Sequence, residues 1–339
     1  EGKYKDFRHP DKVLWTNKIE EDLARRDFTI NAIALGDRII DPFNGQDDIK
    51  NKIIRAVGDP NQRFEEDALR LMRAVRISAE LNFDIEKDTF EALQKNANLI
   101  EEVSWERIRN ELFKLLASMY GYMGIVKLRE AGILQIILPE LEKCFNIIQE
   151  GPKHDRVYDI GEHSLLSLKF CPSKDPLVRF ATLLHDVGKP DTHKIATDGN
   201  VTFYQHDVVG GKIVRQIAKR FNLSKIQTDK LFLLVRWHLF TVDDKQTDSA
   251  IRRFITNVGF YNVDDIMDLR VGDRLGGGTA NAISWRMEEF KKRIHQVMQK
   301  PFSISDLKVN GRDIMKILNI KPGPKVGEIL QKLFEEVLE

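Results

Sequence analysis

Apolar residues recur at every third or fourth position through most of the chain after Phe64, and this spacing is typical of amphipathic helices. Ser104 stands immediately before one such segment and is a good candidate for its N-cap. The pattern predicts helices over Phe64–Leu81, Asp88–Asn96, Trp105–Ser118 and Tyr122–Glu130.

The rest of the chain divides around this helical part. Short β-type runs at Val13–Thr16 and Arg38–Ile40 flank Ile19–Leu35, which is expected to be a helix or a turn and a helix, so the chain opens on a small α/β piece. A linker is predicted at Gly151–Arg156, and a second helical region from about Asp159 to Lys300, where Pro301 ends it. A turn at 321–324 precedes a last helix from Lys325. The expected fold class is mainly α.

Composition indicates a globular protein with real cores and excludes a membrane span. Apolar residues make up 42% of the 339 residues and charged residues 31%. Lys and Arg number 53 against 52 for Asp and Glu, so any surface that attracts nucleic acid must be local. No apolar run reaches the roughly 18 residues that a spanning helix needs. The two cysteines fit a reducing cytoplasm. The start at Glu1, without Met, suggests a segment of a longer protein.

One predicted helix carries a candidate base-reading pair. On Phe64–Leu81, the residues Ala68, Leu71, Met72, Val75 and Ala79 form an apolar stripe, and Glu66, Asp67, Arg70 and Arg73 lie opposite. Asp67 and Arg70 are three positions apart and should be neighbours. A carboxylate can accept from an exocyclic amine while a guanidinium donates to a ring nitrogen or carbonyl, as reading a base edge requires. Ion pairs on the wet face of an ordinary amphipathic helix are the alternative.

A second charged cluster lies earlier in the chain. Arg25 and Arg26 are suited to a triphosphate, because guanidinium is planar and always charged. Asp27 can accept from a sugar hydroxyl or orient an arginine. A charged helix start, with Asp27 or Thr29 as the cap, is the alternative.

Four motifs occur in order and close together: RRDFTINA, DPFNG, RFEEDALRLMRAVR and SWERIRNEL. This series resembles the motifs that follow the catalytic strand in class II tRNA nucleotidyltransferases and bacterial poly(A) polymerases. The resemblance implies a nucleotidyltransferase head followed by a helical neck and body. It also implies template-independent addition of CCA, or part of it, to tRNA 3′ ends from CTP and ATP.

The resemblance also assigns roles to residues of this chain. It implies that Asp67 and Arg70 form a protein template for CTP or ATP, and that Arg26 contacts the nucleotide's phosphates. Glu106, Arg109 and Glu111 match a helix-stabilising motif, and Asp41 and Gly45 match a flexible-loop motif tied to the switch from C to A addition. The complete expected nucleotide site consists of Arg26, Asp27, Asn31, Asp67, Arg70, Arg73 and Arg76.

The chain departs from the family at its start. The family's first motifs are a Gly-Gly turn, an Arg-Asp pair and a DxD strand whose aspartates hold Mg²⁺. Nothing similar precedes Arg25, since Asp6 and Asp11 do not belong to a DxD strand. We therefore expect the catalytic strand to belong to an upstream segment, and the chain as written to bind nucleotides poorly and not to polymerise.

Histidine and aspartate residues mark a second candidate centre. His185 and Asp186 are adjacent at an expected helix end, and imidazole and carboxylate are good ligands for hydrolytic metal ions. The pattern resembles the HD phosphohydrolase superfamily. The resemblance implies a metal site of His163, His185, Asp186 and Asp273, extended by His206 and His238 in two-metal members.

The HD resemblance implies Mg²⁺, Mn²⁺ or Ni²⁺ as the metal, and phosphatase or 2′,3′-cyclic phosphodiesterase activity on RNA ends. Lys189 and Arg274 could contact a substrate phosphate. The alternative is a degenerate scaffold that binds RNA without metal. This hydrolytic activity is the second hypothesis for the function of the chain.

The predicted organisation has four parts: the C-terminal part of a nucleotidyltransferase head (1–57), a helical neck and body (58–150), an all-α HD domain (151–300) and a helical tail (301–339). The tail resembles the C-terminal segment of such proteins and either approaches RNA backbone or forms a solvated hairpin. The expected partners are tRNA, ATP and CTP, and no membrane. The sequence leaves open the oligomeric state and the choice among CCA, CC, A and poly(A) addition.

Overall fold

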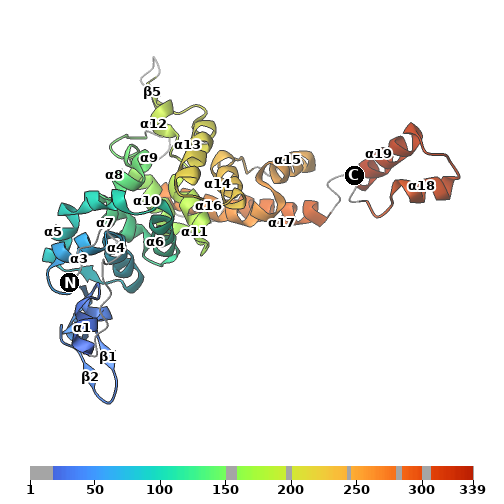
Figure 1. Ribbon diagram of the computed structural model, residues 1–339. Coiled ribbons are helices and arrows are strands. Elements are labelled where there is room, and N and C mark those ends of the chain that lie inside the picture. Colours follow the sequence, from blue (N-terminus) through green and yellow to red (C-terminus); the bar gives the residue numbers. More distant parts are fainter. Residues whose placement is uncertain are drawn as a thin grey trace. The chain divides into compact units, whose positions relative to one another are not determined.

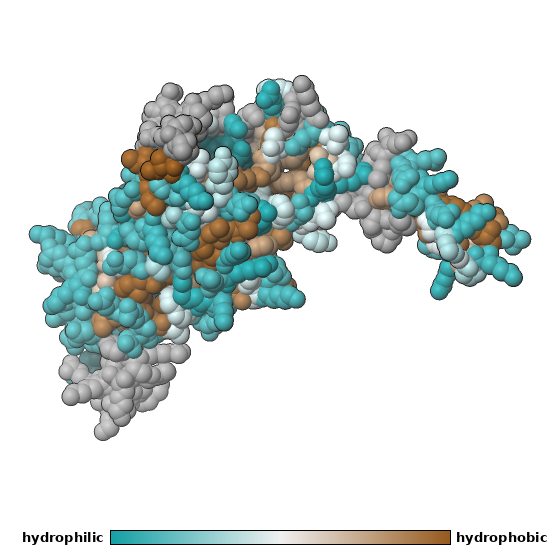
Figure 2. Space-filling model, turned by 90° about the horizontal axis from the view of Figure 1, so that it is seen from above, coloured by the Kyte–Doolittle hydropathy of each residue, from teal (hydrophilic) through white to brown (hydrophobic). Residues whose placement is uncertain are grey.

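The computed structural model describes residues 18–149, 159–195, 201–242, 246–279, 285–299 and 307–338, and these are mainly helical (Figure 1). The chain divides into two compact units. The first comprises residues 1–239 and 264–282, and the second comprises residues 240–263 and 283–339. Neither unit contains, in the ranges given, a helix that is both long and apolar enough to cross a membrane. Hydrophilic residues dominate the visible surface (Figure 2).

The first unit opens on a small α/β piece. β1 and β2 form an antiparallel hairpin in which Ala34 pairs with Ile40. Leu23, Ala32 and Val57 are buried together and form its small core. The elements are α1 (Ile19–Ala24), the 3-10 helix η1 (Thr29–Asn31), β1 (Ala34–Leu35), β2 (Ile39–Ile40), α2 (Gly45–Asn51) and β3 (Ile53–Ile54).

The prediction of a helix through Ile19–Leu35 is wrong beyond its first turns. α1 ends at Ala24, and Phe28 is extended and bridges to Ala56. Ala34 and Leu35 belong to a strand. The tertiary pairing with residues near β3 overrides the local helical pattern here. The expected strand at Val13–Thr16 lies outside the described residues.

A helical layer follows. α4 packs against α6 and α7, and the parallel pair β3–β4 joins this layer to the α/β piece (Figure 1). Ala68, Leu71, Met72, Val75 and Ala79 are all buried, as their stripe predicts. The elements are α3 (Pro60–Glu66), α4 (Leu69–Leu81), β4 (Asp84–Ile85), α5 (Lys87–Lys95), η2 (Ala97–Glu102), α6 (Trp105–Ala117), α7 (Gly121–Glu130), α8 (Leu134–Ile137) and α9 (Pro139–Glu142).

The single helix predicted over Phe64–Leu81 is wrong, because the chain breaks at Asp67. This residue has φ −147° and ψ 101°, an extended conformation between α3 and α4. Its carboxylate accepts a hydrogen bond from the backbone N–H of Leu69 at 3.1 Å and so satisfies one of the free donors at the start of α4. Periodicity does not show the break, because only two residues separate the helices. Ser104 occupies the expected N-cap of α6, but its side chain makes no cap hydrogen bond.

The remainder of the first unit is a helical cluster with one small hairpin. Asp159 and Asp175 cap α10 and α11 through their side chains, and Ser224 forms a capping box with Gln227 at α14. The hairpin β5–β6 was not predicted. The elements are α10 (Ile160–Phe170), α11 (Pro176–Leu184), α12 (Lys189–Thr192), β5 (Lys194–Ile195), β6 (Val201–Thr202), α13 (His206–Arg220), α14 (Lys225–Arg236) and α16 (Val263–Gly276).

The second unit has its own aromatic core. The rings of Phe240, Phe254 and Phe290 lie with their centroids 4.8–6.0 Å apart, which joins α15 to α17. Its elements are α15 (Asp248–Val258), η3 (Phe260–Asn262), α17 (Trp285–Gln299), α18 (Gly311–Leu318) and α19 (Pro324–Leu338). α18 and α19 pack on each other as a hairpin. Whether this tail approaches RNA stays a prediction, and the expected linker at Gly151–Arg156 lies outside the described residues.

Candidate functional site

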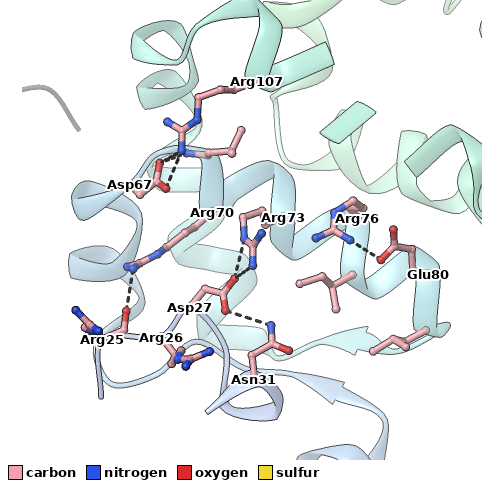
Figure 3. Close-up of a pocket in the computed structure, with 13 residues that line it drawn as sticks. Arg25, Arg26, Asp27, Asn31, Asp67, Arg70, Arg73, Arg76, Glu80 and Arg107 are labelled. Carbon is pink, nitrogen blue, oxygen red and sulfur yellow. Dashed lines mark hydrogen bonds and ion pairs between the residues drawn. The ribbon is translucent and has the colours of Figure 1, made fainter. Parts of the chain in front are cut away.

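A cavity of about 730 Å³ lies where α4 faces the α/β piece (Figure 3). Its volume falls in the range of small-molecule sites. Six arginines and three carboxylates line it, which leaves an excess of three positive charges and favours a polyanion. The lining residues are Arg25, Arg26, Asp27, Asn31, Asp67, Leu69, Arg70, Arg73, Arg76, Ile77, Glu80, Leu81 and Arg107.

Asp67 reaches this cavity from the break between α3 and α4. The Nη2 group of Arg107, on α6, donates to both carboxylate oxygens, at 3.1 and 3.0 Å (Figure 3). With the bond from Leu69, the carboxylate is oriented from two sides. Because a carboxylate offers about four acceptor sites, Oδ2 retains the capacity to accept from a ligand. The Asp67 carboxylate is therefore held in place by the protein's own groups.

Arg70 is fixed by contacts with α3 and with the end of α1. Its Nη1 donates to Glu66 at 2.8 Å and to the carbonyl of Arg63 at 3.0 Å, and its Nη2 donates to the carbonyl of Arg25 at 3.0 Å. These bonds use three of its five N–H groups. Within the described part of the chain, Nε–H and one Nη2–H stay available. This guanidinium can still donate to a base without any rearrangement of its partners.

Asp27 orients neighbouring groups of the cavity. Its Oδ2 accepts from Arg73 Nε at 2.7 Å, and its Oδ1 accepts from Asn31 Nδ2 at 3.2 Å and from the backbone N–H of Phe28 at 3.0 Å. Of the two roles considered for Asp27, the structure shows the orientation of an arginine. Thr29 does not act as an N-cap, since it is the first residue of η1 and its hydroxyl donates to Asp48.

Arg25 and Arg26 supply the accessible positive charge. Their side chains are 67% and 51% exposed, and both pair with Asp22 of α1. Ion pairs as exposed as these contribute little to stability. A triphosphate can therefore replace Asp22 as the partner of either guanidinium at small cost.

Arg76 differs from the other arginines because two carboxylates hold it. Its Nε donates to the buried Glu111 of α6 and its Nη1 to Glu80, both at 2.5 Å. Burial alone would lower the pKa of Arg76, but the bonds to Glu80 and Glu111 outweigh it and raise that pKa. Arg76 therefore lines the cavity with its charge compensated by two carboxylates.

The other motif residues have mainly structural contacts. Arg109 points to the α13–α14 turn, where it donates to the carbonyl of Asn222 at 2.7 Å. Asp41 caps α2 by accepting from the N–H groups of Gly45 and Gln46 at 2.7 and 2.9 Å. These backbone bonds outweigh burial and lower the pKa of Asp41. A side chain at Gly45 would collide with the carbonyl oxygen of Thr29, at 2.2 Å from an added Cβ.

Arg107 was missed by sequence reasoning, although it belongs to the SWERIRNEL motif. Replacing it with leucine is expected to lower kcat/KM for CTP and ATP about 10-fold, because Asp67 loses its orienting donor. The selectivity among nucleotides should fall together with kcat/KM. Loss of a residue with a purely structural role would not change that selectivity. Steady-state kinetics with each nucleotide measures both effects.

Arg109→Leu is the matched control, since it removes an arginine of the same helix that does not line the cavity. It should lower the melting temperature while leaving selectivity intact. Equal selectivity in Arg107→Leu and the wild type would show that Arg107 does not position the template acid.

A second centre lies among α10, α11, α13, α14 and α16. Its six side chains form two groups, and the ligand atoms within each group lie within 4.8 Å of one another. Asp186 connects the groups, because its Oδ2 lies 3.2 Å from His185 Nε2 and its Oδ1 lies 3.3 Å from His206 Nε2. The first group is His163, His185 and Asp273, and the second is Asp186, His206 and His238. All six residues suggested by the HD resemblance are thus brought together.

Backbone carbonyls orient three of the imidazoles. His185, His206 and His238 each place Nδ1 2.7 Å from a carbonyl oxygen three residues earlier, of Thr182, Phe203 and Val235. A carbonyl can only accept, so Nδ1 carries the proton and Nε2 presents a lone pair when the ring is neutral. This is the arrangement in which histidines bind metal ions.

The charges of the centre also suit cations. Burial would raise the pKa of Asp186, but His185 and Lys189 outweigh it and lower that pKa well below its usual value. Burial likewise opposes charge on His185, yet Asp186 and Asp273 raise its pKa to about 10. A divalent ion would displace the proton on His185, and the resulting set of imidazole and ionised carboxylate donors fits such an ion.

Two basic residues and a close turn lie beside this centre. Lys189 Nζ lies 2.6 Å from Asp186 Oδ2 and donates to Gln149 at 2.5 Å, whereas Arg274 Nε has no hydrogen-bond partner among the residues that the structure describes. Gly188 allows the turn after α11 to approach α13, since an added Cβ would lie 2.2 Å from the carbonyl oxygen of His206.

Comparison with known families accounts for most of the chain. The poly(A) polymerase head domain matches residues 1–55, and the RNA and SrmB-binding site of polymerase A matches 82–145. An HD domain matches residues 156–262, and domain 2 of tRNA nucleotidyltransferases matches 279–339.

Individual proteins agree with these matches. The A-adding tRNA nucleotidyltransferase of Deinococcus radiodurans is 36% identical over 332 residues, which is 94% of this chain and 75% of that protein. The CCA-adding enzyme of Streptococcus sanguinis is 48% identical over 345 residues, covering 100% of this chain and 73% of the relative. The crystal structure of the Bacillus stearothermophilus CCA-adding enzyme in complex with CTP has a TM-score of 0.63 at 25% identity, over 96% of this chain and 71% of that one. The resemblance seen in the motifs is thereby confirmed: the chain, which also contains the HD match, belongs to the tRNA nucleotidyltransferase family together with CCA-adding and A-adding enzymes.

Proposed function

We propose that this chain selects and positions the nucleotide in an enzyme that adds nucleotides to tRNA 3′ ends without a nucleic-acid template. The main support for this proposal is that Asp67 and Arg70 line the same cavity, and that each is already held by hydrogen bonds to other protein groups. Relatives named as CCA-adding and A-adding enzymes support tRNA as the acceptor, and a relative's complex with CTP supports a nucleoside triphosphate as the donor.

The base is selected by the acid and the guanidinium together. Cytosine and adenine carry an exocyclic amine, whereas uracil carries a carbonyl at the equivalent position. Oδ2 of Asp67 accepts from that amine, and the free N–H groups of Arg70 donate to the neighbouring ring nitrogen or carbonyl. CTP and ATP thus satisfy the same two side chains, and UTP places two acceptors against each other.

The triphosphate is bound by the exposed arginines. Arg25 and Arg26 exchange Asp22 for phosphate oxygens, and Arg73, oriented by Asp27, adds a third guanidinium. We propose Mg²⁺ for this reaction, in which bound ions would supply activation of the primer hydroxyl and stabilisation of the leaving pyrophosphate. Asp27, Asp67 and Glu80 each bind an arginine, so these carboxylates position groups and leave metal binding to other residues.

The four-part organisation proposed from the motifs is consistent with this assignment. The head (1–57) and the neck and body (58–150) form the cavity from both sides, since Arg25 to Asn31 belong to the first and Asp67 to Arg107 to the second. We propose that residues 151–300 form the HD domain and that residues 301–339 form the tail.

Primer extension by the intact enzyme tests this function. The substrate is tRNA that ends before CCA, offered with each nucleoside triphosphate singly and in combination. Incorporation of CTP, of ATP, or of both in order is expected, and the products show which bases are added. Failure to extend this tRNA with any nucleotide would contradict the proposal.

A second activity is favoured by the two converging metal groups. We infer that the HD centre hydrolyses phosphoesters, and that Mn²⁺, Ni²⁺ or Mg²⁺ held by Asp186 and the histidines would activate water there. Lys189 is placed to pair with a substrate phosphate once metal ions occupy Asp186. Hydrolysis of bis-p-nitrophenyl phosphate and 2′,3′-cAMP tests this activity, and no turnover with any of the three metals would exclude it.

A further inference from the structure

The cavity extends along α4 beyond Asp67 and Arg70. Residues from Arg70 to Leu81 line it along α4, eleven positions apart, which corresponds to about 16 Å at 1.5 Å per residue. Stacked bases of one strand are about 3.4 Å apart, so this length accommodates a base read by Asp67 and Arg70 and at least one more stacked beyond it. Figure 3 shows Arg76 and Glu80 toward the opposite end of α4 from Asp67.

The far end of the cavity has a different chemistry from the template end. Arg76 is clamped between Glu80 and Glu111, so its guanidinium plane is fixed and its charge is compensated. Ile77 and Leu81 are four positions apart on the helix and are therefore neighbours on one face. Leu81 is 47% exposed and can contact a ligand, whereas Ile77 beside it is only 7% exposed.

We propose that this far end, formed by Arg76, Ile77 and Leu81, is a stacking platform for the 3′-terminal base of the tRNA acceptor. The inference rests on the proposed function. Exposed bases of RNA stack on guanidinium planes and on apolar side chains, and stacking tolerates any base because every base has a π-face. An enzyme that adds nucleotides in succession meets a different terminal base after each step. Stacking does not depend on which hydrogen-bonding groups the terminal base carries, so the platform accepts each of them.

The alternative role for this end is binding of a phosphate. The two carboxylates on Arg76 disfavour it, because a phosphate would have to displace the buried Glu111 or lie beside Glu80. Arg25, Arg26 and Arg73 provide less compensated charge for phosphates nearer the template pair. The terminal base is thus the ligand that matches the apolar and planar surfaces of the far end.

Leu81→Ala in the intact enzyme is the direct test. Alanine is a good helix former, and Leu81 is the last residue of α4, so the fold should be retained. The KM for tRNA lacking CCA is expected to rise about 5-fold, with the KM for CTP unchanged. Leu81→Phe should lower the KM for tRNA, because an aromatic ring stacks better than leucine.

A tRNA carrying 2-aminopurine as its terminal base reports stacking directly, since its fluorescence is quenched when it stacks. Quenching on binding should weaken in Leu81→Ala and strengthen in Leu81→Phe. Met119→Ala, which removes an exposed side chain that does not line the cavity, is the control and should change neither quantity.

Unchanged KM for tRNA and unchanged quenching in both Leu81 variants would overturn the platform. The proposed function would still stand if the same wild-type enzyme extends the tRNA with CTP or ATP. Absence of extension by the wild type would instead remove the function on which the platform rests.

Discussion

The Arg70→Ala enzyme is expected to lose about 10- to 100-fold in kcat/KM for CTP and ATP. A bidentate contact to a base contributes about 1–3 kcal/mol, and a tenfold change in rate corresponds to about 1.4 kcal/mol. Arg70 is already oriented by Glu66 and two carbonyls, so its contact to the base costs little reorganisation. Steady-state extension of tRNA lacking CCA measures the loss.

Arg63→Ala is the matched control for this variant. Arg63 pairs with the same carboxylate, Glu66, at 2.6 Å, and its side chain is 12% exposed against 13% for Arg70, but it does not line the cavity. Both variants should lose stability to a similar degree, whereas only Arg70→Ala should lose most of its kcat/KM. Equal kinetic losses in the two variants would mean that Arg70 acts through folding alone.

Asp186→Asn is expected to abolish phosphoester hydrolysis, with a loss of about 100-fold or more. The two carboxylate oxygens of Asp186 contact histidines of both metal groups, so its replacement weakens both groups at once. Bound metal should also stabilise the wild type, by about 2.7 kcal/mol when its concentration is 100 times the Kd. This metal-dependent rise in melting temperature should disappear in the variant.

The control for Asp186→Asn is Asp229→Asn, an exposed position on α14 away from the centre. It should retain hydrolysis and the metal-dependent rise in melting temperature. Nucleotide addition to tRNA should persist in both variants, because the cavity beside α4 shares no residue with the HD centre. Full hydrolysis by Asp186→Asn would show that the centre is not the hydrolytic site.

The sequence predicted most of the helices, several of the residues that line the cavity beside α4 and the residues of the HD centre. The helices and the HD residues were predicted for different reasons. The buried stripe of α4 follows from helical spacing, so Leu71, Met72 and Val75 were foreseeable as core. The two groups of histidines and aspartates were assembled from a superfamily resemblance, because residues as distant as His163 and Asp273 have no local pattern that joins them. These histidines and aspartates come together only because the five helices that carry or adjoin them pack against one another.

The sequence did not predict the environment of the candidate base-reading pair, Asp67 and Arg70. The break at Asp67 preserves the apolar spacing on both sides, so no periodicity argument detects it. Arg107 lies 40 positions after Asp67 in sequence, and its role follows only from the packing of α6 on α4. Likewise, nothing in the sequence distinguishes Arg76 from its neighbours until Glu111 is seen beside it.

The most direct test of the central claim is the ratio of kcat/KM for CTP to that for UTP, measured on tRNA lacking CCA for the wild type and for Asp67→Asn. The amide keeps the size of the carboxylate but adds a donor that can pair with the carbonyl of uracil. If Asp67 reads the exocyclic amine, this ratio should fall at least about 10-fold in the variant. A ratio equal to that of the wild type would contradict base selection by the acid and guanidinium beside α4.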